Sequence, residues 1–248
     1  MGELRLRDDS GRLLTTGDRR IGDLATELRT VGFAAVPDAL TPQGLALAQH
    51  EVRDYLTSHG GHAHELLIPA QWNCPTLTAL GLDPALEAIL ATLAGAMVPP
   101  AVVSDFGSRS LRIFDGDQSA RTNPNDWHYD ASVITLLIAI IVPGNATGHH
   151  ATVPNHRVHR KHRWGNIVDK ALTQNRVHGR WTAREFARHP DGHTIRFTEG
   201  AGYLFTGHRT LHRAMEWPDG QVRATLNLHY GLPYRRARSA DGPVLAAP

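Results

Sequence analysis

The chain has 248 residues, of which 41% are hydrophobic and 20% are charged, so it is long enough to bury the core of one large domain. Its 26 Lys and Arg residues nearly balance 24 Asp and Glu residues, and a net charge of +2 argues against a uniformly basic nucleic-acid binder. The single cysteine, Cys74, excludes an internal disulfide and a zinc site built from several thiolates. We expect one domain over residues 1–248, with flexible ends at 1–20 and 236–248.

The sequence shows neither a signal peptide nor an unbroken apolar run long enough to span a membrane. The N-terminal segment is polar and lacks a signal-peptide core. The longest apolar run, residues 133–142, is too short to span a bilayer and suits a buried strand. We therefore expect a cytoplasmic protein with no membrane partner. No oligomeric state is predicted.

The first third of the chain predicts helices. Thr41 and Asp83 are each followed by proline, which is typical of an N-cap and the first helical position. Apolar residues then recur at helical spacing, and a glycine, Gly95, ends the second stripe. A short strand is expected at 32–36.

Beyond about residue 101 the pattern changes to strands. Two helical pieces, near 166–173 and 181–189, interrupt them. Helices followed by runs of strands predict an α+β fold with a sandwich or barrel at its centre. The strands are expected at 101–106, 109–114, 127–142, 194–198, 202–206 and 222–230.

A basic, histidine-rich segment interrupts the strands. Residues 149–196 hold ten Lys and Arg against three Asp and Glu, and eight of the 16 histidines. We interpret 156–196 as an insert, which is either a solvated loop or a lid that attracts an anionic substrate. Nucleic-acid contact is a weaker alternative, because only Trp164 and Trp181 supply aromatic residues among the charges.

Two adjacent metal ligands are predicted at the start of the long apolar strand. Residues i and i+2 of a strand point to one face, so His128 and Asp130 face together while Tyr129 faces away. An imidazole and a carboxylate in this arrangement supply two members of a 2-His-1-carboxylate triad, which leaves open positions on iron for a co-substrate and oxygen. A second His-x-Asp, at 189–191, contains proline, which opposes a regular strand, so we interpret it as a loop.

The third ligand is expected from a late strand. A strand at 202–206, a turn and a second strand would return His212 to the core. His208 is the alternative, but it stands beside Gly207 at the turn, where a histidine is usually exposed or contacts substrate.

Arginine on apolar strands suggests where an anion binds. Arg223 interrupts an apolar strand, and burying it is unfavourable unless it meets an anion. Its planar guanidinium can bind a carboxylate through two parallel hydrogen bonds. The alternative is an internal Asp or Glu partner. Arg112 lies on an alternating strand, where it either faces inward to a co-substrate or substrate anion or stands exposed at an edge.

Together these residues resemble the iron(II)/2-oxoglutarate-dependent oxygenases, most closely the phytanoyl-CoA dioxygenase-like branch, over roughly residues 30–231. Residues 31–40 resemble that family's opening strand, and 147–157 resemble its loop ending in Pro-Gly-Ser-His, although Pro154-Asn155-His156 lacks the Gly-Ser. The resemblance implies a double-stranded β-helix, a jelly-roll or cupin-like barrel buttressed by N-terminal helices.

The resemblance also implies roles for individual residues. His128, Asp130 and His212 would bind Fe(II), and Arg223 would pair with the distal carboxylate of 2-oxoglutarate. Thr225, on the same strand face as Arg223, and Arg112 would add co-substrate contacts, whereas His208 and Arg157 would contact substrate.

The resemblance implies an enzyme that uses Fe(II), 2-oxoglutarate and O2 to hydroxylate a small polar or anionic metabolite, in a setting such as bacterial natural-product biosynthesis. A carboxylate at Asp130 favours hydroxylation, desaturation, epimerisation or ring formation over halogenation. The alternatives are a non-catalytic jelly roll that binds metal or a small ligand, a cupin-type dioxygenase that does not use 2-oxoglutarate, and an oxygenase directed at nucleic acid.

Overall fold

The computed structural model describes residues 19–60, 64–67, 72–98, 106–114, 127–144, 149–158, 186, 189, 192–215 and 220–233. The ends predicted to be flexible, at 1–20 and 236–248, lie outside these residues except for 19 and 20. Most of the basic insert, both helical pieces predicted near 166–173 and 181–189, and nearly all of the strand predicted at 101–106 lie outside these residues.

Four helices come before the long strands in the part of the chain that the structure describes. Both predicted N-caps are confirmed: the Thr41 hydroxyl accepts a hydrogen bond from the Gly44 amide at 3.1 Å, and the Asp83 carboxylate accepts one from the Ala85 amide at 2.7 Å. The helices are α1 (Arg19–Thr30), α2 (Pro42–His59), α3 (Pro75–Gly81) and α4 (Pro84–Met97).

The stretch Pro75–Met97 is long and apolar enough to cross a membrane by composition alone. It is, however, broken into α3 and α4 around the Asp83 cap, and the buried side of α4, including Leu86, Leu90 and Leu93, belongs to the main core. Its apolar character is therefore explained by packing against the sheet.

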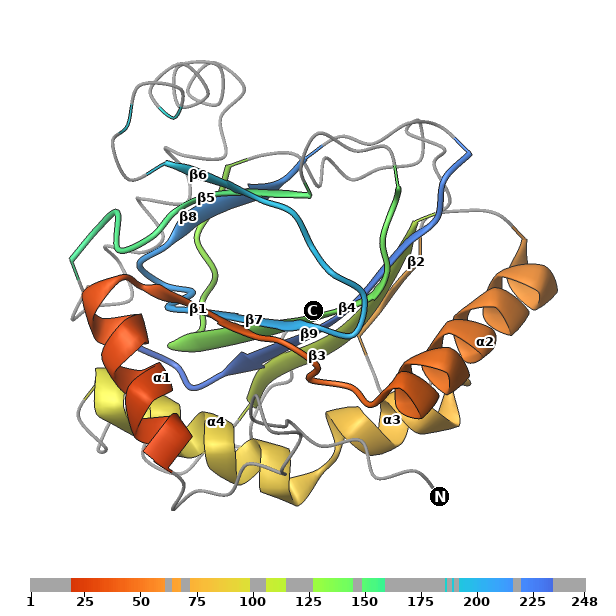
Figure 1. The fold of residues 1–248 in the computed structure, drawn as a ribbon, viewed down its shortest axis with the longest axis horizontal. Helices are drawn as coiled ribbons and strands as arrows, with labels where there is room; N and C mark the ends of the chain where they lie inside the picture. The colour runs from red at the N-terminus through yellow and green to blue at the C-terminus, as the bar shows by residue number, and fades with distance from the viewer. Residues whose placement is uncertain are drawn as a thin grey trace, which may run out of the picture.

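A six-stranded antiparallel sheet, the major sheet, forms one wall of the barrel. Its strand order is β1-β7-β4-β9-β3-β2, so β4 and β9 are central. Figure 1 shows all four helices on one face of this sheet, where they bury its apolar side chains. The strands are β1 (Phe33–Val36), β2 (His64–Leu66), β3 (Phe106–Phe114), β4 (Ile134–Ile141), β7 (Gly202–Phe205) and β9 (Arg223–Tyr230).

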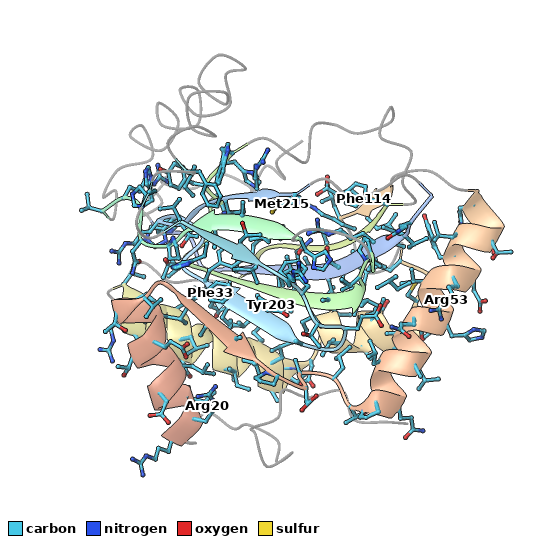
Figure 2. All side chains as sticks on the ribbon, turned by 45° about the horizontal axis from the view of Figure 1, so that its top comes forward. Arg20, Phe33, Arg53, Phe114, Tyr203 and Met215 are labelled. Atoms are coloured by element: carbon cyan, nitrogen blue, oxygen red, sulfur yellow. The ribbon has the colours of Figure 1, made fainter. Side chains whose placement is uncertain are left out.

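A three-stranded antiparallel sheet, the minor sheet, lies over the opposite face of the major sheet (Figure 1). Its order is β6-β5-β8, with β6 at His193–Ile195, β5 at His150–Val153 and β8 at Leu211–Ala214. Side chains from both sheets pack between them: Phe33 and Tyr203 of the major sheet, both labelled in Figure 2, share an apolar cluster with Ile195 of the minor sheet. Two facing antiparallel sheets with helices behind one of them form the predicted α+β jelly roll.

The prediction of a strand at 127–142 is wrong for residues 127–133. His128 forms only an isolated bridge with His212 of the minor sheet, residues 131–133 bend, and β4 begins at Ile134 in the major sheet. The amide of Val133 donates to the carbonyl of Tyr230 at 3.0 Å, so the chain has joined β9 by that point. This segment therefore crosses from one sheet to the other, which places His128 and Asp130 between them.

Cys74 is a buried free thiol at the start of α3. Burial, and to a lesser extent the nearby carboxylates of Glu51 and Asp54, raise its pKa to about 12. The thiol is therefore neutral at physiological pH and serves as an apolar core residue.

Candidate metal centre and cavity

Reciprocal backbone hydrogen bonds place two histidines side by side. The His128 amide donates to the His212 carbonyl at 2.9 Å, and the His212 amide donates back at 3.0 Å. Residues opposed in this way on antiparallel strands carry neighbouring side chains on one face. Accordingly, the centroids of the two imidazole rings are 4.3 Å apart.

The turn before β8 holds the carboxylate of Asp130 against these rings. The Asp130 amide donates to the Gly207 carbonyl at 3.1 Å. A Cβ atom on Gly207 would lie 2.6 Å from the hydroxyl oxygens of both Ser132 and Thr135, so only glycine allows this close approach. Asp130 Oδ1 then lies 3.5 Å from His212 Nε2 and 3.8 Å from His128 Nε2.

The three side chains offer a donor set that fits a divalent metal. Their ligand atoms all lie within 4.8 Å of one another. His212 Nδ1 donates to the Thr210 carbonyl at 3.0 Å, which leaves the lone pair of Nε2 available to a metal. Thr135 Oγ1 donates to Asp130 Oδ2 at 2.5 Å, which leaves Oδ1 facing the imidazoles. Two imidazoles and one carboxylate arranged in this way match the facial triad of Fe(II) sites.

The charge state of Asp130 also fits a ligand role. Burial would raise the pKa of this carboxyl, but the imidazoles of His212 and His229, through charge and hydrogen bonding, outweigh burial and hold the pKa well below its ordinary value. The side chain is therefore a carboxylate, the form that binds metals.

Thr135 is expected to orient the carboxylate. Changing Thr135→Val removes the hydroxyl that holds Asp130 Oδ2 and should lower the affinity for Mn(II) or Fe(II) about 10–100-fold, the usual effect of losing a group that positions a metal ligand. Metal affinity is measured by anaerobic competition with a chelating dye. Ser132→Ala is the matched control, because Ser132 Oγ contacts Thr135 at 2.9 Å and should have a smaller effect. Equal losses in the two variants would contradict a specific role for Thr135.

The predicted metal ligands and co-substrate residues line a single cavity between the two sheets. It encloses about 510 Å³ of empty space, including its open mouth. Its walls come from β3, β4, β5, β7, β8 and β9 together with the crossing segment. The lining residues are Arg112, Phe114, His128, Asp130, Thr135, Leu137, His150, Phe205, His212, Ala214, Arg223, Thr225, Asn227 and His229.

Arg223 is 5% exposed at the start of β9. Its Nη1 donates to the carbonyl of His149 at 3.0 Å, and its guanidinium lies 5.4 Å from the ring centroid of Phe197. Thr225 lies two residues further on the same strand face, and its hydroxyl accepts a long hydrogen bond, 3.4 Å, from the Asn227 amide group. A buried cation and a hydroxyl on one wall of a cavity can bind an anion.

Arg112 combines its two expected positions, facing the cavity and being exposed at an edge. It lines the cavity, yet its side chain is 35% exposed, and its Nε donates to Glu65 Oε1 at 2.7 Å. Glu65 belongs to β2, a strand that the sequence analysis missed because three residues show no periodicity. A co-substrate role for Arg112 stays a prediction.

His229 was also missed, although it lies beside the predicted metal ligands. Its Nδ1 is 3.5 Å from Asp130 Oδ2 and 3.2 Å from Thr135 Oγ1. Alternation along β9 could have revealed it, because Arg223, Thr225, Asn227 and His229 share one strand face and all line the cavity.

Of the two alternatives given for His208, exposure to solvent or contact with substrate, the first is wrong. Its side chain is 2% exposed, and its amide donates to the Ser132 carbonyl at 2.8 Å, so it holds the turn against the crossing segment. Arg157 supports the same turn: its Nε donates to the His208 carbonyl at 2.7 Å, and its guanidinium lies 3.9 Å from the ring centroid of Tyr129. Substrate contact by His208 or Arg157 stays a prediction.

Comparison with known proteins supports the fold. No protein-family model and no curated protein matches the chain. Solved structures do match, among them the non-heme α-ketoglutarate-dependent epimerase SnoN from nogalamycin biosynthesis, at 19% identity and a TM-score of 0.61 over 86% of this chain and 83% of SnoN. The α-ketoglutarate-dependent carbocyclase SnoK from the same biosynthesis matches at 18% identity and a TM-score of 0.59, over 88% of this chain and 86% of SnoK.

EctD from S. alaskensis, solved with bound Fe, matches at 14% identity and a TM-score of 0.60, over 93% of this chain and 84% of EctD. At these identities the likeness establishes the fold alone, and the predicted double-stranded β-helix is confirmed. The phytanoyl-CoA dioxygenase-like branch stays a prediction.

Proposed function

We propose that this protein is an Fe(II)- and 2-oxoglutarate-dependent oxygenase that acts on a small molecule. The observation that carries the proposal is that His128, Asp130 and His212 converge on one point in the wall of a cavity that Arg223 also lines. The SnoN structure, which shares this fold, is a complex with Fe3+, α-ketoglutarate and nogalamycin RO. Fold and donor set therefore support the same chemistry.

Bound iron would supply the activation of dioxygen that is coupled to oxidative decarboxylation of 2-oxoglutarate. His128, Asp130 and His212 would hold the metal on one face and leave the remaining positions open to the co-substrate and oxygen. Arg223 and Thr225 would bind the distal carboxylate of 2-oxoglutarate and orient it along the cavity. The apolar walls, including Leu137 and Phe205, would exclude bulk water from the reacting groups.

Arg223 and the predicted metal ligand His212 are separated by a distance that suits a small diacid. Arg223 donates to the carbonyl of His149, whereas His212 pairs in register with Thr152, three residues along. Three residues of strand span about 10 Å. The metal ion and the Arg223 guanidinium would each occupy part of this 149–152 span, and a 2-oxo diacid is long enough to bridge the rest.

A second hollow beside the metal ligands suggests where the substrate binds. It shares Arg112, His128, Asp130 and His229 with the first cavity and has about 730 Å³ of empty space, including open solvent. The polar side chains of Arg112 and His229 favour a polar or anionic substrate. Hydroxylation, desaturation, epimerisation and ring closure are all compatible with a carboxylate at Asp130, and natural-product biosynthesis in the cytoplasm is the setting we propose.

Spectroscopy and product analysis test the proposal. Anaerobic addition of Fe(II) and 2-oxoglutarate to the protein should give a visible metal-to-ligand charge-transfer band, and oxygen should then produce succinate. Metal and 2-oxoglutarate binding without succinate would instead favour a non-catalytic jelly roll. Oxygen consumption with no 2-oxoglutarate binding would favour a cupin-type dioxygenase.

A further inference from the structure

His150 lines the cavity but has no role in the proposed function described above. It begins β5, is 6% exposed, and lines the same cavity as the metal ligands and Arg223. Its ring lies against three others, at centroid distances of 5.2 Å from His212, 5.7 Å from Phe197 and 5.8 Å from Phe205. The imidazole is therefore fixed by packing on aromatic neighbours.

Neither ring nitrogen of His150 has a hydrogen-bond partner among the residues that the structure describes. Burying a polar group without a partner is unfavourable, and most buried polar side chains have one. Phenylalanine or leucine would fill the same space between aromatic rings without this penalty. An imidazole at this position therefore suggests a partner that enters the cavity.

His150 lies between the two groups that would hold a diacid. The centroid of its ring lies 5.2 Å from that of His212, and it lines the same cavity as Arg223, whose Nη1 donates to the carbonyl of the preceding residue, His149, at 3.0 Å. An imidazole N–H in this position can donate a hydrogen bond to a ligand that enters the cavity.

We propose that His150 is a further binding residue for the co-substrate: its N–H donates a hydrogen bond to a carboxylate oxygen of the 2-oxo acid held between the metal ligands and Arg223. This inference depends on the proposed function. The hydrogen bond adds directional recognition of an acid that a purely apolar wall would lack. His150 thus contributes to selecting a 2-oxo acid as the co-substrate.

Three variants separate this role from a structural one. His150→Leu removes the donor and keeps an apolar side chain. His150→Gln keeps an N–H donor. Thr152→Val is the matched control, because Thr152 is buried on the same face of β5, and its hydroxyl also has no hydrogen-bond partner in the described part of the chain, but it does not line the cavity. All three leave the predicted metal ligands and Arg223 intact.

The measurements are the affinity for Mn(II) alone, the affinity of the Fe(II) form for 2-oxoglutarate under anaerobic conditions, and the unfolding temperature of the ligand-free protein. His150→Leu should weaken 2-oxoglutarate binding about 10–100-fold, as expected for losing a hydrogen bond to a charged group, and His150→Gln should recover part of the loss. Mn(II) affinity should not change, and the unfolding temperature of His150→Leu should stay equal or rise. Thr152→Val should match the parent in 2-oxoglutarate affinity.

Two results would overturn the inference. One is parent-like 2-oxoglutarate affinity in His150→Leu. The other is a loss of affinity that comes with a lower unfolding temperature or weaker Mn(II) binding, because a packing role would produce it. If the parent itself binds Mn(II) but not 2-oxoglutarate, the proposed function fails, and the role of His150 fails with it. The parent's affinity therefore distinguishes the two failures.

Discussion

Changing Asp130→Ala is expected to abolish Fe(II)-dependent succinate formation. Asp130 supplies the only carboxylate of the metal-ligand set found among the described residues, and its Oδ1 faces the Nε2 atoms of both His128 and His212. Without it, two imidazoles remain, and metal affinity should fall at least about 100-fold, more than is usual for losing a group that only orients a ligand. Anaerobic metal titration and succinate assays measure the two effects.

The chain offers a control that shares the sequence motif. Asp191→Ala alters the second His-x-Asp, at 189–191, which the sequence analysis interprets as a loop; Asp191 itself lies outside the described residues. This variant should bind metal and form succinate like the parent. An Asp130→Ala protein that turns over 2-oxoglutarate as fast as the parent would rule out the assigned metal centre.

Changing Arg223→Leu should raise the KM for 2-oxoglutarate and the dissociation constant of its anaerobic complex by about 100–10,000-fold. Two charge-assisted hydrogen bonds to a carboxylate would be lost, and each contributes about 1.5–3 kcal/mol. Arg223→Lys keeps the charge but not the planar fork and should fall between the parent and Arg223→Leu. Mn(II) affinity should not change, because Arg223 is not a metal ligand.

Arg109→Leu is the matched control for Arg223. Arg109 lies on the neighbouring strand β3, is partly buried, and pairs with Glu87 of α4 at 3.4 Å rather than lining the cavity. Its replacement should leave 2-oxoglutarate affinity unchanged. Because Arg223 also donates to the His149 carbonyl, the unfolding temperature of Arg223→Leu must be measured as well. Unchanged affinity for 2-oxoglutarate in folded Arg223→Leu would rule out the role assigned to Arg223.

The late strands were predictable because each has a strong local pattern. The strand expected at 222–230 is β9 at Arg223–Tyr230, and the one expected at 202–206 is β7 at Gly202–Phe205. The grouping of His128 with Asp130 was also predictable, although alternation along a regular strand was an incomplete reason for it. The two residues lie on a crossing segment, and the turn at Gly207 brings the carboxylate to the rings.

Other parts of the site depend on contacts that local sequence does not contain. His150 faces the cavity only because β5 pairs with β8, whose His212 and Ala214 are opposite Thr152 and His150. Glu65 reaches Arg112 from a three-residue strand that has no periodicity of its own. Helix α1 was missed as well; it has no acidic residue in its first turn to mark its start.

The central position of β9 has a consequence for the order of events during synthesis. β9 pairs with both β3 and β4, yet it comes last among the described strands. Until residue 230 has left the ribosome, β3 and β4 have no strand between them, and the wall that carries Arg223 does not exist. Pairing over such long sequence separations is slow, so we expect the nascent chain to acquire its active conformation only after translation of β9, and to depend on chaperones until then.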